Sequence, residues 1–151
     1  MAFDDILAEL AHTMGLESLR LDENNVCRLR FADDLVVDIE HVPARSRFYL
    51  HAVVGTAPVD ESPLLAEMLA ANLFGQGTGD ATLAVDPVLG EVLLLRGFDE
   101  AGSDARSVAA GLELFLAALD DWRGRMLHGG AGASVSVGEK TWARAGQVMW
   151  G

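Results

Sequence analysis

The sequence predicts an α+β fold in which helices pack on a twisted antiparallel sheet within one compact domain. Three observations lead to this prediction. Apolar residues recur at helical spacing in three separate stretches, segments with a period of two lie between those stretches, and 151 residues are enough for one domain with a buried core. The predicted order over residues 1–128 is helix, three strands, helix, two strands and a long helix.

The first helix is predicted at the N-terminus. Its apolar residues recur three or four positions apart and are Phe3, Ile6, Leu7, Leu10, Ala11 and Met14. Asp4 and Asp5 suit the positive N-terminal end of a helix, and Gly15 suits the C-terminal end. We therefore expect an amphipathic helix with one apolar face.

Three strands are predicted to follow as a meander. The inward-facing residues are Cys27, Leu29, Phe31, Leu35, Val37, Ile39, Phe48, Leu50, Ala52 and Val54. A turn through residues 32–34 places Arg28 opposite Asp38 in the first hairpin. The outer face of the meander is therefore expected to carry ion pairs in contact with water.

A second helix and a second hairpin come next. Ser62 and Pro63 are typical of a helix start, and Gly75 suits the helix end. Two strand-like stretches, "ATLAVD" and "EVLLLRGF", flank the turn "PVLG". The second stretch is apolar on both faces, so we expect both faces to be covered by helices or by a second subunit.

A long final helix and a tail complete the chain. Ser103 or Asp104 suits the N-cap of the helix, which is predicted to end by His128. Residues 129–151 are rich in Gly, Ala and Ser and lack periodicity, which predicts a flexible tail. The tryptophans of the tail leave open that it docks on the domain.

Gly75, Gly77 and Gly79 alternate in a loop that is superficially similar to a phosphate-binding loop. In nucleotide-binding motifs a strand precedes the glycines and a helix follows them, because the phosphate meets the free N–H groups of the helix N-terminus. Here a helix precedes and a strand follows, and the loop carries Asp80 but no Lys or Arg. We therefore interpret the loop as a structural turn and expect no cofactor.

The chain is acidic, with 23 acidic against 11 basic residues and a net charge of −12. This charge repels phosphate groups, so neither nucleic acid nor an anionic membrane is expected as a partner. No apolar run is long enough to cross a membrane, and the acidic start "MAFDDILAEL" is unlike a secretory signal. These features favour a cytoplasmic protein.

No motif in the sequence indicates catalysis or a metal site. The four histidines are far apart, and none has the spacing of a metal ligand set. Serine-nucleophile motifs are missing, and the single cysteine, Cys27, is expected to be a small buried side chain. The chain is therefore not expected to be an enzyme, and no metal is expected.

One stretch resembles a known family. "LLAEMLAANLFGQGTGDATLAVDPVLGEVLLLR", residues 64–96, is similar to the Tir chaperone (CesT-like) family, the class I chaperones of bacterial type III secretion. The matching positions are Leu69, Asn72, Leu73, Gly75, Gly79, Leu83, Asp86, Gly90 and Leu94. The order of elements extends the resemblance to residues 3–128.

The resemblance implies a homodimer that uses no ATP and holds the N-terminal chaperone-binding segment of a secreted effector in extended form. The implied partners are secreted effectors, a second copy of the chain and the export machinery. The implied dimer interface contains Leu65, Met68, Leu69, Asn72, Leu73, Leu93 and Leu95. The implied effector contacts are Phe3, Leu7, Leu10, Leu29, Phe31 and Phe48, each of which is also a candidate for the core.

Two other functions stay open at this level. A protein of the same fold can be an adaptor or regulator without a role in secretion, and a pocket assembled from distant residues can serve a small-ligand enzyme or sensor. A dimer that binds an unfolded segment argues against both alternatives.

Overall fold

The computed structural model describes residues 2–58, 63–128 and 145–149. The elements are α1 (Phe3–Thr13), β1 (Val26–Phe31), β2 (Val36–Val42), β3 (Arg47–Thr56), α2 (Pro63–Ala71), β4 (Thr82–Asp86), β5 (Glu91–Asp99), α3 (Ala105–Leu127) and β6 (Ala145–Met149). Short 3₁₀ turns join several of them. Up to α3, the order is the one that the sequence predicts.

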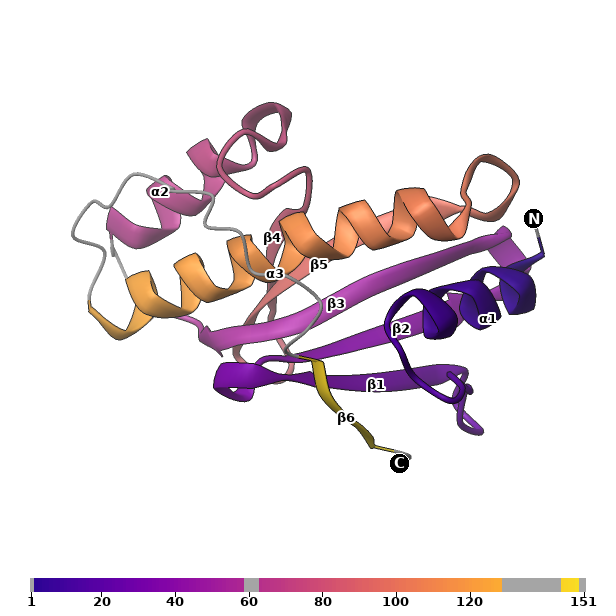
Figure 1. Ribbon diagram of the computed structural model, residues 1–151. Helices are drawn as coiled ribbons and strands as arrows, with labels where there is room; N and C mark the ends of the chain where they lie inside the picture. Colours follow the sequence, from indigo (N-terminus) through magenta and orange to yellow (C-terminus); the bar gives the residue numbers. More distant parts are fainter. Residues whose placement is uncertain (1, 59–62, 129–144, 150–151) are drawn as a thin grey trace.

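The strands form one antiparallel sheet in the order β4-β5-β3-β2-β1-β6. Figure 1 shows α1 and α3 lying across the same face of this sheet, with α2 beyond its β4 side. Within the described residues, the other face carries no helix along β1, β2 and β3, and its side chains there are polar or partly exposed. The architecture is α+β, as predicted.

The first hairpin has the predicted register. Arg28 lies opposite Asp38, and its guanidinium donates two hydrogen bonds of 2.8 Å to the two carboxylate oxygens. Asp33 and Asp34 in the turn have φ of 63° and 57°, a left-handed conformation that Asp tolerates better than most residues. The turn therefore closes the hairpin without a glycine.

The core lies between the helix-covered face of the sheet and the two helices, α1 and α3. Its largest fully buried side chains include those of Trp122, Phe115, Phe48 and Leu50. The indole Nε1 of Trp122 donates a 2.9 Å hydrogen bond to the carbonyl oxygen of Gly77. This bond satisfies the buried polar atom and ties the C-terminal part of α3 to the glycine loop.

Asp104 is the N-cap of α3. Its carboxylate accepts a 2.7 Å hydrogen bond from the backbone N–H of Ser107, and the Ser107 hydroxyl pairs with the backbone N–H of Asp104 at 3.0 Å. The bond from the Ser107 backbone lowers the pKa of the Asp104 carboxyl. The helix ends at Leu127, so both of its predicted limits are confirmed.

The glycine loop after α2 is a structural turn. Gly75 has φ of +67°, and a Cβ on Gly77 would stand 2.6 Å from the Cβ of Ala71, so that position admits only glycine. The side chain of Asn72 bridges α2 to β4, because it accepts from the backbone N–H of Leu83 at 2.8 Å and donates to the carbonyl of Leu83 at 2.9 Å. α2 begins at Pro63 as predicted, and Ser62 lies outside the described residues.

The C-terminal residues differ in part from the sequence-based expectation. Residues 145–149 lie within the stretch predicted as a flexible tail, yet they form β6 beside β1. A short strand on a sheet edge is held by backbone groups of its neighbour, so composition alone does not reveal it. The rest of this stretch, including Trp142 and Trp150, lies outside the described residues.

The bridge made by Asn72 leads to a test of stability. In Asn72→Ala the backbone N–H and carbonyl of Leu83 lose their partners, which should lower the free energy of unfolding by about 2–3 kcal/mol. Urea denaturation followed by circular dichroism measures this change. The control is Gln76→Ala, which truncates an exposed residue of the same loop. Equal stability of the two variants would contradict the structural role of Asn72.

The burial of Cys27 leads to a second test. Burial raises the pKa of its thiol to about 11, so roughly one molecule in a thousand carries a thiolate at pH 8. A disulfide reagent such as dithionitrobenzoate should react slowly with the folded chain at pH 8 and rapidly after unfolding in guanidinium. Rapid reaction with the folded protein would show that Cys27 is accessible.

Candidate partner-binding surfaces

Several charged side chains of the described residues form ion pairs, including Arg28 with Asp38 on the sheet and Arg125 with Asp121 on α3. No group of three or more His, Cys, Asp or Glu side chains within these residues is arranged to hold a metal ion. No helix in the described ranges is long and apolar enough to cross a membrane. The surfaces that stand out are instead exposed apolar side chains, two hollows and one sheet edge.

The first surface is the α2 patch, which we define as Leu69, Leu73 and Phe74. These side chains are 73%, 60% and 84% exposed. All three lie within six residues at the end of α2 and in the 3₁₀ turn that follows it. Exposed apolar groups of this size are typical of an interface with another chain.

Phe74 has an unusual backbone. Its φ of 55° and ψ of 20° lie in the left-handed region, which costs a bulky residue on the order of 1–3 kcal/mol. The hydrogen bonds that flank it, from Gly75 N–H to the Asn72 carbonyl and from Gln76 N–H to the Leu73 carbonyl, hold the turn in place. The strained turn therefore presents a large aromatic side chain to solvent.

A second exposed group lies at the tip of the β4–β5 hairpin. Its members are Val85, Val88 and Leu89. The carboxylate of Asp86 accepts hydrogen bonds from the backbone N–H groups of Val88 and Leu89 at 2.8 and 3.1 Å, which fixes the turn. The tip is thus a formed turn with apolar side chains directed outward.

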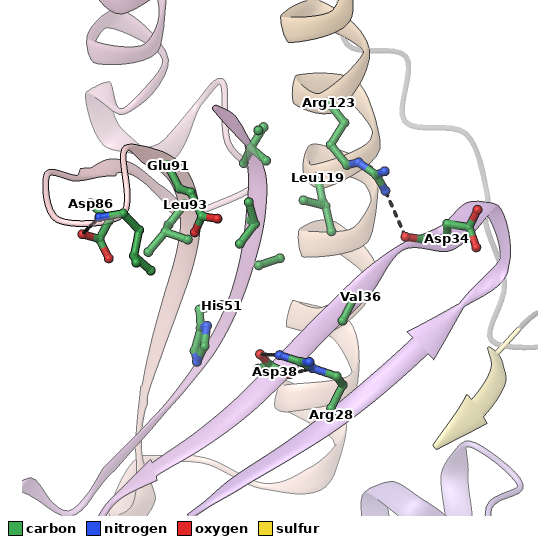
Figure 2. Close-up of a pocket in the computed structure, with 15 residues that line it drawn as sticks. Arg28, Asp34, Val36, Asp38, His51, Asp86, Glu91, Leu93, Leu119 and Arg123 are labelled. Carbon is green, nitrogen blue, oxygen red and sulfur yellow. Dashed lines mark hydrogen bonds and ion pairs between the residues drawn. The ribbon is translucent and has the colours of Figure 1, made fainter. Parts of the chain in front are cut away.

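The largest hollow among those described lies beside this hairpin and encloses about 570 Å³. Figure 2 shows Leu93 and His51 on one side of it, and the Arg28–Asp38 ion pair on the other. Arg123 of α3 reaches across to donate a 3.1 Å hydrogen bond to the carbonyl of Asp34. The two arginines that line the hollow, Arg28 and Arg123, therefore already form hydrogen bonds within the chain. The wall of the hollow is partly polar and partly apolar.

The residues predicted for a dimer interface fall into three groups. Leu69 and Leu73 are exposed in the α2 patch, while Leu65 is partly buried against the core. Met68 is buried, and Asn72 is bound to β4. The remaining two, Leu93 and Leu95, are partly exposed on the face of β5 opposite the core residues Val92 and Leu94.

The residues predicted for effector contacts are mostly buried in the described structure. Five of the six, namely Phe3, Leu7, Leu10, Leu29 and Phe48, are core side chains with at most 4% exposure, and Phe31 is partly buried. The first of them stacks on His41 with ring centroids 4.1 Å apart. The apolar faces of α1 and the meander pack on each other, so these side chains are largely covered within the chain.

Leu7 nevertheless lines a hollow that opens on the surface. This α1 hollow encloses about 340 Å³ between α1 and the segment that leads to β1. Its apolar lining consists of Leu7, Ala8, Ala11, Leu19 and Leu21, and its polar lining consists of Asp4, Glu17, Ser18 and Arg20. Ala8 is exposed, so the hollow is accessible from solvent.

The last surface is the edge of β1 away from β2. β6 pairs with this edge between residues 28 and 31. A strand edge carries a row of backbone donors and acceptors, which makes it a template for a further strand. The α1 hollow and the β1 edge are close in the chain, because residues 17–21 line the hollow and β1 starts at Val26.

Sequence reasoning did not identify several of these features. Phe74 lies in the stretch 64–96 that resembles the family but is not among the predicted site residues, because a sequence pattern does not reveal a left-handed turn. The apolar hairpin tip was interpreted only as a turn. The hydrophobic "VL" inside "PVLG" was a signal that could have identified it, because turn tips are usually polar.

One protein-family model matches most of the chain. The model of the Tir chaperone protein (CesT) family matches residues 5–123. Among curated proteins, none matches the chain. Similar solved structures include the ExsC–ExsE complex, at 24% identity and a TM-score of 0.65, covering 80% of this chain and 90% of that one.

Two further structures have the same fold. The HopA1–SchA chaperone–effector complex matches at 16% identity and a TM-score of 0.67, covering 79% of this chain and 91% of that one. The Yersinia pestis type III secretion chaperone SycH, in complex with a stable fragment of YscM2, matches at 19% identity and a TM-score of 0.65, covering 80% and 99%. With the family model matched over residues 5–123, the chain belongs to the Tir chaperone protein (CesT) family.

Proposed function

We propose that this chain is a type III secretion chaperone that binds the N-terminal segment of a secreted effector in extended form and keeps it soluble and competent for export. The observation that carries the proposal is the family match over residues 5–123. The solved relatives with this fold support it, since one is a chaperone–effector complex and another a type III secretion chaperone bound to a protein fragment. The chain acts as a binding protein, without catalysis or ATP, in the bacterial cytoplasm.

Cargo binding rests on two interactions. Apolar side chains of the effector enter the α1 hollow beside Leu7 and Ala8, and backbone groups of the effector extend an edge of the sheet. Burial of apolar area contributes about 25 cal/mol per Å², which over a long wrapped segment offsets the several kcal/mol needed to order it. The net charge of −12 favours basic cargo and keeps the loaded protein soluble.

The second part of the proposal is a homodimer formed through the α2 patch. Leu69, Leu73 and Phe74 are too exposed for a core role, and a second copy covers them in a symmetric interface. Leu93 and Leu95 on the partly exposed face of β5 extend the same interface, with Leu65 at its margin. Met68, which is buried in the core, and Asn72, which is hydrogen-bonded to β4, contribute indirectly by holding α2 in position.

The dimer is tested by Leu69→Glu. A carboxylate placed in an apolar interface has no partner there, so the variant should be a monomer at micromolar concentration, whereas the wild type is a dimer. Light scattering coupled to gel filtration measures the mass. The control is Leu127→Glu, an equally drastic change at an exposed leucine near the end of α3. A Leu69→Glu variant that stays dimeric would place the interface elsewhere.

Cargo binding is tested by purifying the full chain from its bacterial host under secretion conditions and identifying the proteins that accompany it. We expect an effector whose N-terminal segment is protected from proteolysis. In Ala8→Glu, a charge enters the α1 hollow, and effector recovery should fall at least about tenfold, a loss of roughly 1.4 kcal/mol in binding.

The control for this variant is Ala110→Glu, the same change at an exposed position of α3. Equal recovery with both variants would remove the α1 hollow from the cargo site. Recovery of no effector, together with a monomeric mass, would overturn the proposed function. A folded protein found in place of an effector would favour an adaptor or regulator, and a small molecule would favour a sensor or enzyme.

A further inference from the structure

β6 covers the edge of β1 that β2 leaves free. The register joins Arg28 to Met149, Leu29 to Val148 and Arg30 to Gln147. It then skips one residue, Gly146, before Phe31 meets Ala145, and an unpaired residue of this kind marks a β-bulge. In Figure 1 the short yellow β6 lies beside β1 at the side of the sheet opposite β4.

Nothing in β1 itself prevents another strand from pairing there. Its sequence, VCRLRF, contains no proline, and its residues pair with β2 in a regular register. The guanidinium of Arg28 is held by Asp38 of β2. Natural proteins protect open edges with proline, charged side chains, bulges or a covering segment. β1 carries two arginines and no proline, and β6 covers its edge between residues 28 and 31.

We propose that β6 is an internal placeholder for the cargo strand, so that the effector segment and residues 145–149 compete for the same edge of β1. This inference rests on the proposed function, in which cargo extends the sheet. The α1 hollow is close to β1 in the chain, because residues 17–21 line it and β1 begins at Val26. In this proposal a cargo segment of sufficient length pairs with β1 and also fills the hollow.

Tethering sets the strength of the competition. Residues 128–144 connect α3 to β6 within one chain, so β6 competes at an effective concentration on the order of millimolar. The paired part of β6 has the sequence AGQVM, which contains no charged residue, and its register involves only residues 28–31 of β1. A cargo that also fills the α1 hollow gains contacts outside that register, whereas a segment that offers only backbone pairing does not displace β6.

The experiment uses the full chain with two substitutions in β6, Gln147→Pro and Val148→Pro together. In an antiparallel pair, alternate N–H groups point toward the neighbouring strand, so two consecutive prolines remove the donor whichever residue supplies it. The matched control is the pair Gln147→Ala and Val148→Ala, which changes the same side chains and keeps both N–H groups. Hydrogen exchange of the β1 amides reports directly on whether the edge is covered.

The probe is a synthetic peptide with the sequence of residues 141–151, TWARAGQVMWG, labelled with a fluorophore. An edge that β6 occupies at least about nine-tenths of the time lowers the apparent affinity for an added strand about tenfold. The proline pair should therefore bind the peptide at least about tenfold more tightly than the wild type or the alanine pair. The effector segment recovered in the purification should displace the peptide and should itself bind more tightly to the proline pair.

Two results would overturn the inference alone. Equal peptide binding and equal β1 exchange in all three proteins would show that β6 does not cover the edge. Effector binding that is the same in the proline and alanine pairs, with peptide binding enhanced, would show that cargo uses another surface. Recovery of no effector would overturn the proposed function and the competition with it, a result that is distinct from the first two.

Discussion

The packing of α1 and α3 on a single face of the sheet is the constraint on which the rest of the structure depends. It buries the inward residues of every strand from β1 to β5 on one side, including Leu50 and Leu94. In the part of the chain that the structure describes, no helix covers the other side of β1, β2 and β3, which carries ion pairs between neighbouring strands, such as Arg28 with Asp38. Large apolar side chains outside this core, such as those of Leu69, Leu73 and Phe74, stay exposed to solvent. They are therefore the candidates for contact with a partner.

The sheet order separates those surfaces. The α2 patch lies beyond β4, whereas the edge of β1 lies at the other side of the sheet, and the order β4-β5-β3-β2-β1 sets four strand spacings, roughly 19 Å, between the two sides. A dimer formed through the α2 patch therefore leaves the edge of β1 available for pairing with another strand. The bridge from Asn72 to Leu83 and the bond from Trp122 to Gly77 fix α2 and its loop to the domain, so that the patch has a defined position.

Local sequence patterns were sufficient to predict the helices and strands up to α3 and much of the strand pairing. Arg28 opposite Asp38 and Asp104 as the cap of α3 follow from alternation and from side-chain chemistry within a few residues. Sequence patterns did not predict which apolar side chains are exposed to solvent. Phe3 and Phe74 are the same residue type on short elements, yet the first is buried on His41 and the second is exposed, because periodicity identifies an apolar face and tertiary packing decides whether that face is covered. β6 escaped detection for the same reason, since its only described partner is the backbone of a distant strand.

A protein that adds a foreign strand to its own sheet faces a conflict between function and solubility. An open edge suited to cargo is equally suited to another copy of the chain, and pairing between edges leads to aggregation. Permanent protection by proline or by charge would also exclude the cargo. A strand such as Ala145–Met149, joined to the domain by its own chain, resolves the conflict, because it pairs with β1 and a segment with additional apolar contacts can replace it. In the proposed mechanism β6 protects the edge of β1 when no cargo is bound, and only a segment with additional apolar contacts replaces it. The free energy that orders the cargo then comes from the hollow beside α1 as well as from the edge.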